Sequence, residues 1–190
     1  MSLGTTLKPM PPRLREANGA FRVVYTTKLA AMQKSDQAVG FMRSLGVPAR
    51  DVYGIRVAKS EYGYRSLGAN SPDITKAQHC RAEFYTPAHG WVPVDPADVR
   101  KVILEEKPDA QLPIDDPQVK AARVKLFGAW EMNWLAFNTA HDVALPKSAN
   151  GKIPFLMYPQ AETASGRLDS LDPDNFRYQM TAQELNSFGV

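Results

Sequence analysis

The sequence predicts an α+β domain, and three observations predict it. Apolar residues recur at helical spacing over residues 29–45. Two short segments of strand type, 78–85 and 91–95, flank a turn that contains both proline and glycine. A helix start then stands at Asp116-Pro117, with aspartate as the N-cap and proline at the first helical position. A helix, strands and a further helix in this order are typical of the α+β class.

The chain begins with a lead-in and a strand before the first helix. Residues 1–20 combine prolines with scattered charge and show no periodicity, which predicts an extended segment. Residues 21–25, Phe-Arg-Val-Val-Tyr, predict a short strand. The helix over 29–45 has threonines before it as candidate caps, and Gly46 with Pro48 two residues later is a stop signal.

The elements around the hairpin are a strand, a loop and a long helix. Residues 51–57 predict the strand, and residues 58–77, rich in Gly, Asn, Ser and Pro, predict the loop. The helix that begins at Pro117 is predicted to run to His141. Its apolar stripe recurs at steps of three and four and consists of Phe127, Trp130, Trp134, Phe137 and His141.

These elements predict a chain of three parts. Residues 1–20 are the lead-in and residues 21–104 form the core. Residues 105–190 add a helical, loop-rich C-terminal extension to the same domain.

Composition excludes several classes of protein. The balance of 23 basic and 20 acidic residues is too even for a nucleic-acid-binding surface. No stretch approaches the ~18 apolar residues of a membrane span. The single cysteine excludes an internal disulfide, and three histidines without i, i+4 pairing predict no metal site. Without a secretory signal we expect a cytoplasmic protein by default, or a periplasmic one if a native N-terminal region is missing.

The hairpin carries the side chains best suited to catalysis. Alternation along a strand places His79, Arg81 and Glu83 on one polar face. A turn centred on residue 88 sets Glu83 opposite Pro93 and Arg81 opposite Asp95, which puts His79 diagonal to Asp95. A carboxylate beside an imidazole holds one tautomer and stabilises the protonated ring, so this pair is the base and orienting half of a nucleophilic triad.

A purely structural interpretation of the same residues stays open. In it, Arg81 and Asp95 form a surface ion pair and His79 is only a strand histidine. Cys80 points to the opposite, apolar face of the strand, so we interpret it as a small buried core residue and not as the partner of His79.

Two segments resemble a known family. Residues 46–50, Gly-Val-Pro-Ala-Arg, resemble the Gly-Ile-Pro-Ala-Arg segment of the transglutaminase-like superfamily. Residues 79–85, His-Cys-Arg-Ala-Glu-Phe-Tyr, followed by Gly-Trp-Val-Pro-Val-Asp-Pro at 90–96, resemble its His-x-x-x-Glu-x-Tyr and Gly-Trp-x-Pro-x-Asp-Pro block. Both segments come in the family's order, and the resemblance covers residues 39–104 of what looks like a bacterial member.

The resemblance implies a papain-like α+β fold, with a nucleophilic cysteine at the N-terminus of a helix packed on an antiparallel sheet. Carried over by motif, His79 is the general base and Asp95 the orienting carboxylate. Tyr85 and Trp91 are candidates to line the substrate cleft. The implied chemistry is hydrolysis or acyl transfer at amide bonds of a peptide or protein, through a Cys-His-Asp triad and without a cofactor.

The nucleophile departs from the family pattern. Counting back from the Gly-Val-Pro-Ala-Arg segment to the family's cysteine gives Ala31, and no cysteine precedes Cys80. An alanine has nothing to ionise or to attack with. Hydroxyl groups near the helix start (Thr26, Thr27 and Ser35) are the remaining nucleophile candidates, although such residues normally cap helices.

Three functions are compatible with this sequence. The first is a transglutaminase-like domain that is impaired or inactive because its cysteine is replaced at Ala31. The second is a non-catalytic module that binds an extended peptide or protein in the same cleft, with Tyr85 and Trp91 as aromatic contacts. The third is an active acyl-transfer enzyme that uses a hydroxyl group.

Overall fold

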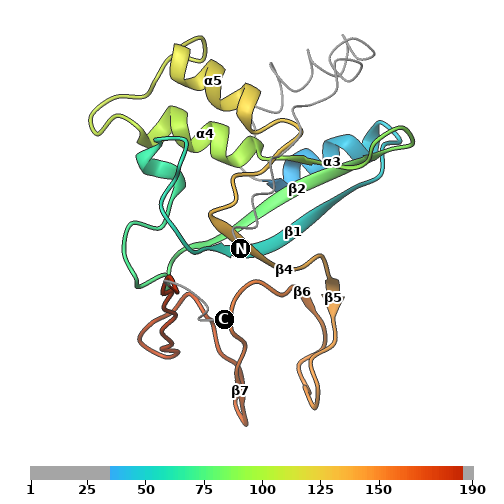
Figure 1. The fold of residues 1–190 in the computed structure, drawn as a ribbon. Helices are drawn as coiled ribbons and strands as arrows, with labels where there is room; N and C mark the ends of the chain where they lie inside the picture. The colour runs from blue at the N-terminus through green and yellow to red at the C-terminus, as the bar shows by residue number, and fades with distance from the viewer. Residues whose placement is uncertain (1–34, 186–190) are drawn as a thin grey trace, which may run out of the picture. The chain divides into compact units, whose positions relative to one another are not determined.

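The computed structural model describes residues 35–185, which fall into two compact units (Figure 1). The first unit comprises residues 35–51 and 81–131, and the second comprises residues 52–80 and 132–185. Each unit is described by itself below. The predicted lead-in, the strand over 21–25 and the first turns of the helix over 29–45 lie outside the described residues.

A four-stranded sheet runs through the fold in the order β3-β2-β1-β4. Its strands are β1 (Ala49–Arg56), β2 (Gln78–Thr86), β3 (Gly90–Val94) and β4 (Trp134–Asn138). The β2–β3 and β1–β4 pairs are antiparallel. Antiparallel strands with helices confirm the predicted α+β class.

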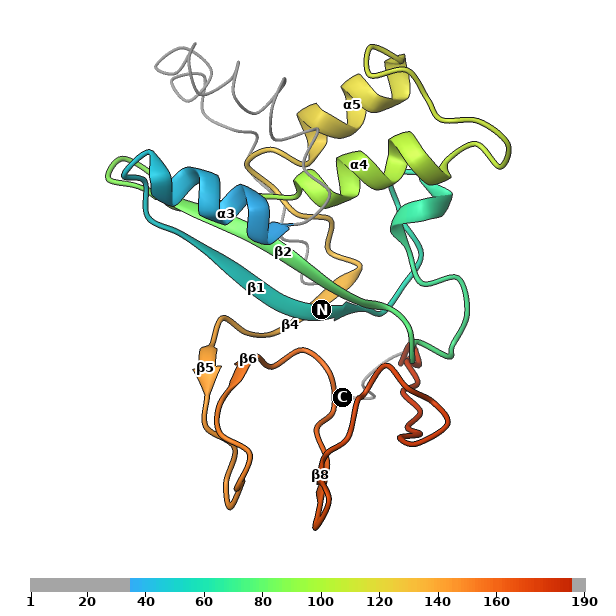
Figure 2. The same cartoon turned by 180° about the vertical axis from the view of Figure 1, so that it is seen from behind.

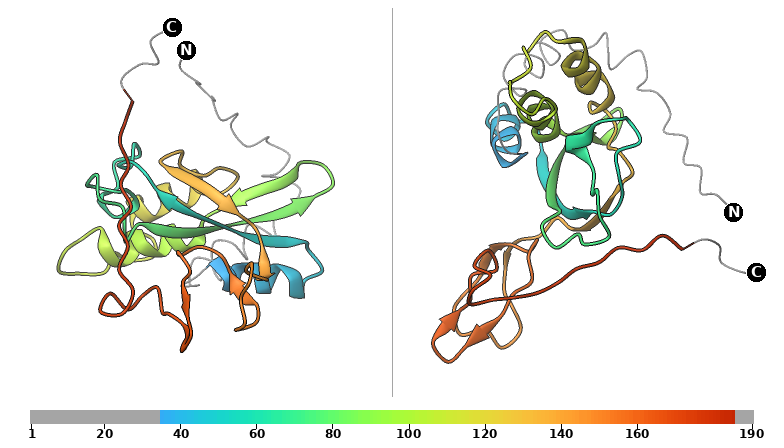
Figure 3. Two further views of the ribbon diagram at one scale, coloured as in Figure 1. Left: turned by 90° about the horizontal axis from the view of Figure 1, so that it is seen from below. Right: turned by 90° about the vertical axis from the view of Figure 1, so that its left-hand side faces the viewer.

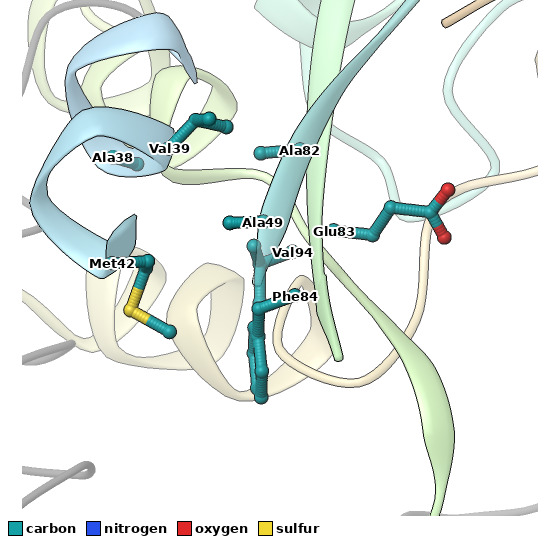
Figure 4. Close-up of a pocket in the computed structure, with 8 residues that line it drawn as sticks. All are labelled: Ala38, Val39, Met42, Ala49, Ala82, Glu83, Phe84 and Val94. Atoms are coloured by element: carbon teal, nitrogen blue, oxygen red, sulfur yellow. The ribbon is translucent and has the colours of Figure 1, made fainter. Parts of the chain in front are cut away.

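In the first unit, α3 (Ser35–Ser44) packs on β2 and β3 (Figures 2 and 4). The buried side chains of this core come from both layers: Ala38, Val39 and Met42 from the helix, and Ala49, Ala82, Phe84, Val92 and Val94 from the strands. Glu83, which lies between two core residues of β2, points its carboxylate away from α3 (Figure 4). This arrangement follows from strand alternation and confirms the predicted apolar face.

The predicted stop signal of this helix is confirmed. Gly46 has a φ of +75°, which a residue without a Cβ adopts easily. Its N–H donates to the carbonyl of Arg43 at 3.0 Å, and the Val47 N–H donates to the carbonyl of Met42 at 3.0 Å. These two bonds form a Schellman motif, which satisfies the last carbonyls of α3.

Two further helices complete the first unit and lie side by side: α4 (Pro96–Glu105) and α5 (Pro117–Lys125) (Figures 1 and 3). Each has an aspartate N-cap followed by proline. The Asp95 side chain accepts from the Asp98 N–H, and the Asp116 side chain accepts from the Gln118 N–H. The start of α5 is as predicted, whereas α4 is an element that the sequence analysis did not predict.

The predicted helix to His141 is wrong beyond residue 125. The helix ends at Lys125, and Gly128 then adopts a φ of +84°. The Gly128 N–H donates to the Pro93 carbonyl at 2.8 Å, and the Leu126 carbonyl accepts from the Asp95 N–H at 3.0 Å. Pairing with the edge of β3 therefore replaces further helical turns. Three residues of the predicted stripe lie on strands, with Trp134 and Phe137 on β4 and His141 on β5 (His141–Val143).

The second unit is built of short strands and turns, as the loop-rich composition predicts. The hairpins are β5 (His141–Val143) with β6 (Ile153–Phe155), and β7 (Glu162–Thr163) with β8 (Gly166–Arg167). A single 3-10 turn, η2 (Arg65–Leu67), interrupts the predicted loop. No helix within residues 35–185 is long and apolar enough to cross a membrane.

Candidate functional site

Arg81 lies at the centre of a buried polar cluster in the first unit. Its side chain is fully buried, and so are those of Asp95 and Asp98. Arg81 Nε lies 3.0 Å from Asp95 Oδ2, and Nη2 lies 3.8 Å from Asp98 Oδ2. Nη1 donates to the main-chain carbonyl of Glu131 at 2.6 Å. One guanidinium thus contacts two carboxylates and one carbonyl, which come from two parts of the unit, the start of α4 and the segment after α5.

Asp95 is held at the junction between β3 and α4. Its Oδ1 accepts from the Asp98 N–H at 2.9 Å as the N-cap of α4, while Oδ2 faces Arg81. Its own N–H donates to the Leu126 carbonyl at 3.0 Å, and the preceding carbonyl, of Val94, accepts from Trp130 Nε1 at 3.1 Å. Backbone and side chain of Asp95 are therefore both fixed.

The predicted register of the hairpin is confirmed, since Glu83 pairs with Pro93. Arg81 and Asp95 also form the predicted ion pair. The structural interpretation of these residues placed the pair on the surface. The pair is buried instead, because neither side chain is exposed. A buried charge in such a place needs a partner, and each of these two supplies it to the other.

His79 belongs to the second unit, near the start of β2. Its side chain is partly buried, and its carbonyl accepts from Trp134 Nε1 at 2.9 Å. It stands two residues before Arg81 in one continuous strand, so the two side chains leave β2 on the same face. The pairing of His79 with Asp95 remains a prediction.

Cys80 is less buried than predicted: it is partly exposed and not a closed core residue. It lies close enough to Tyr158 for the two groups to interact. Burial raises the pKa of the Tyr158 phenol, and the neighbouring Cys80 raises it further. A phenol is therefore one of the groups near this cysteine.

The two aromatic residues predicted to line a cleft contact each other on the outer face of the hairpin. Tyr85 and Trp91 are cross-strand partners, with ring centroids 5.6 Å apart in an edge-to-face arrangement. Arg50 places its guanidinium 4.0 Å from the centroid of the Trp91 ring and pairs with Glu83 at 2.9 Å. Tyr85 and Trp91 remain 40% and 38% exposed, so this supported aromatic surface is open to a ligand.

The remaining nucleophile candidates and histidines of the sequence analysis are not among the described members of the buried polar cluster. Ala31 is outside the described residues, as are Thr26 and Thr27, and the side chain of Ser35 is not described either. His89 is exposed in the hairpin turn, where its Nδ1 lies 3.3 Å from Thr86 Oγ1. His141 is exposed on β5, and its ring meets Tyr53 edge to face at 5.6 Å.

Sequence reasoning missed two members of the buried cluster. Asp98 follows Asp95 by three positions, and the sequence analysis gave it no role in a site. Glu131 takes part through its backbone carbonyl, for which a sequence carries no signal.

Comparison with known proteins gives one family. Residues 12–96 match the model of the transglutaminase-like superfamily. An uncharacterized protein of Haemophilus influenzae is 40% identical over 156 residues, which cover 77% of this chain and 41% of that protein. The chain thus spans about two fifths of the length of this relative. No solved structure matches the chain with significance.

Proposed function

Since residues 12–96 match the model of the transglutaminase-like superfamily, we propose that the chain carries two thirds of an acyl-transfer triad. His79 is the general base and Asp95 its orienting carboxylate. The observation that supports this proposal is the fully buried Asp95, held by Arg81 and by the Asp98 N–H, beside the strand that bears His79.

Asp95 has the properties that an orienting carboxylate needs. The contact with a guanidinium at 3.0 Å favours its ionised form. An ionised carboxylate offers about four lone-pair positions, so the cap bond and the ion pair leave room for an imidazole N–H. Such a bond selects one tautomer of His79 and turns its other nitrogen toward the nucleophile.

The missing nucleophile limits what the chain can do. In a thiol acyl transfer, a thiolate attacks the amide carbonyl, and the imidazolium gives its proton to the departing amine. The acyl group then passes from sulfur to water or to a second amine. Ala31, at the family's cysteine position, supplies no sulfur. We therefore propose that the chain as given is catalytically impaired at amide bonds.

Restoring the thiol tests this proposal. In the variant Ala31→Cys, iodoacetamide should alkylate the new thiol rapidly near neutral pH, because an imidazole and a helix N-terminus both stabilise a thiolate. Rates would be followed by peptide mass spectrometry, which separates the new thiol from Cys80. Adding His79→Ala should slow the reaction about tenfold or more.

The neighbouring variant Ala30→Cys is the matched control. Its thiol stands one residue away on the same segment and should react at an ordinary rate that does not depend on His79. Equal rates for Ala30→Cys and Ala31→Cys, or a fast rate that His79→Ala leaves unchanged, would contradict the assignment of the triad.

A second candidate, a peptide-binding function, is favoured by the exposed Tyr85–Trp91 pair. Aromatic side chains that are already fixed against each other lose little conformational freedom when a ligand covers them. We expect an immobilised peptide library to retain the wild-type chain, and Trp91→Ala to lose most of that binding. Phe137→Ala, which removes another exposed aromatic side chain, on β4, should not change it. Loss of binding in both variants would indicate non-specific adsorption.

A further inference from the structure

We propose that Arg81 is a positioning residue for the triad: it fixes the carboxylate of Asp95, and through Asp95 it sets the tautomer of His79. This inference rests on the proposed roles of His79 and Asp95 and adds to them a residue that reaches neither the nucleophile nor a substrate.

The geometry around Arg81 supports this role. Its three nitrogens point to three different partners, at Asp95, Asp98 and the Glu131 carbonyl. A planar guanidinium that is hydrogen-bonded at one corner and forms ion pairs at the other two has a defined orientation, so the position it offers to Asp95 Oδ2 is also defined. The hydrogen bond to the Glu131 carbonyl, at 2.6 Å, ties Arg81 to the segment that follows α5.

The orientation of the Asp95 carboxylate depends on Arg81, because the other carboxylate oxygen is already hydrogen-bonded. Oδ1 is tied to the Asp98 N–H, so rotation of the carboxylate about its last bond is the remaining freedom, and Arg81 at 3.0 Å from Oδ2 removes it. The charged groups that face this carboxylate in the first unit are Arg81 from β2 and Asp98 from α4, both fully buried. With no exposed surface at these side chains, water is a poor substitute for the guanidinium.

Lysine at this position would not be equivalent. A single ammonium group carries the same charge but cannot serve Asp95, Asp98 and the Glu131 carbonyl in one plane. The substitution Arg81→Lys therefore separates positioning from charge. If Arg81 acts only as a positive charge, lysine preserves its function; if it positions Asp95, lysine loses a large part of it.

Nitrogen-15 spectra of the imidazole rings test the proposal in the chain as it exists. Neutral His79 should show a single tautomer in the wild type, because Asp95 accepts from one ring N–H. Arg81→Met and Arg81→Lys should both give the averaged signal of two tautomers, and Asp95→Ala, which removes the acceptor, should do the same. His89 and His141 serve as references in each spectrum, since neither lies in the buried cluster.

Reactivity of the restored thiol gives a second readout. In the Ala31→Cys background, Arg81→Lys should lower the His79-dependent rate of iodoacetamide alkylation by about tenfold or more, since small displacements of a catalytic group carry large rate costs. Arg167→Lys is the matched control. Arg167 also pairs with a carboxylate, Glu162 at 2.9 Å, but it belongs to the second unit, and its exchange should leave the rate unchanged.

The outcomes separate the two proposals. If His79 shows mixed tautomers in the wild type, or if its single tautomer survives in Asp95→Ala, the proposed His79–Asp95 pair is wrong. If Asp95→Ala gives mixed tautomers but Arg81→Lys does not, the pair stands and the positioning role of Arg81 is overturned. A circular dichroism spectrum identifies a variant that has unfolded. Where Arg81→Met unfolds, the charge-conserving Arg81→Lys decides the question.

Discussion

Arg81 is one of the largest side chains that are fully buried in the described part of the chain. Burying a guanidinium is unfavourable unless each of its donors finds a partner. Here the Glu131 carbonyl accepts a hydrogen bond, two carboxylates form ion pairs with the guanidinium, and all three groups lie within residues 95–131. The residue therefore ties β2 to α4 and to the segment after α5, whatever its role toward His79.

Stability measurements should reveal this role of Arg81. Arg81→Ala removes the one guanidinium from two buried carboxylates, so we expect the free energy of unfolding to fall by about 3–5 kcal/mol. Urea denaturation followed by tryptophan fluorescence measures the change. Arg167→Ala, which removes a partly exposed ion pair, should reduce the free energy of unfolding by less than about 1 kcal/mol. Similar losses for the two variants would mean that burial does not distinguish the two arginines.

Among the elements, those with local signals form where the sequence predicts them. β2 and β3 alternate and enclose a Pro- and Gly-containing turn, α5 has an aspartate cap before proline, and α3 ends at Gly46. The end of α5 has no such local signal, because the helix stops where residues 126–128 pair with β3. Aromatic residues at steps of three and four were compatible with a longer helix but did not require one.

Gly54 shows how closely two elements can approach. A Cβ at this position of β1 would lie 2.3 Å from the Leu135 carbonyl oxygen and 2.5 Å from Trp134 Cζ2, both on β4. Gly54→Ala should therefore force β1 and β4 apart and lower the free energy of unfolding by about 1–3 kcal/mol.

The same exchange in α3 should have the opposite effect. Gly40 is exposed in the helix, and no described atom lies within 4 Å of the position its Cβ would take. Gly40→Ala should raise the free energy of unfolding by about 0.5–1 kcal/mol, because alanine favours a helix more than glycine does. Urea unfolding of both variants checks the signs. An unchanged free energy of unfolding for Gly54→Ala would show that β1 and β4 can move apart at little cost.

At the scale of the whole molecule, the interactions that stabilise each unit can be compared. The first has an apolar core between α3 and the sheet and a buried ionic cluster. The second unit also buries apolar side chains, among them Ile55, Leu67 and Ile153, and side-chain hydrogen bonds stabilise its turns. In that unit the pKa values of Asp73, Glu162 and Asp172 all lie below their ordinary values. The largest causes are hydrogen bonds from Thr75, Ser148 and Asn175 respectively.

These turns should weaken in acid. A carboxyl group whose pKa is lowered by folding stabilises the fold above its unfolded pKa, near 4 for Asp and Glu. That stabilisation is lost as the pH falls through the lower pKa of the folded chain. Carboxyl titration by NMR should therefore place the midpoint of Asp73 below that of an ordinary aspartate.

Thr75→Val isolates the cause at Asp73. It removes the side-chain hydrogen bond that contributes most, so the pKa of Asp73 should rise toward its ordinary value. The pKa values of Asp172 and Glu162 in the same spectra should not move, which makes them internal controls. An unchanged midpoint for Asp73 would mean that the Thr75 hydroxyl does not bind its carboxylate in solution.

The sequence by itself determined the α+β class, the hairpin and its register, the N-cap of α5, the end of α3 and the resemblance to the transglutaminase-like superfamily. These features rest on alternation, cap chemistry and motifs, all of which act over a few neighbouring residues. Only the tertiary structure decided that Arg81 and Asp95 are buried, that Asp98 and the Glu131 carbonyl join them, and that α5 gives way to strand pairing at Leu126. Each of these depends on groups far apart in the chain, whose meeting no local pattern encodes.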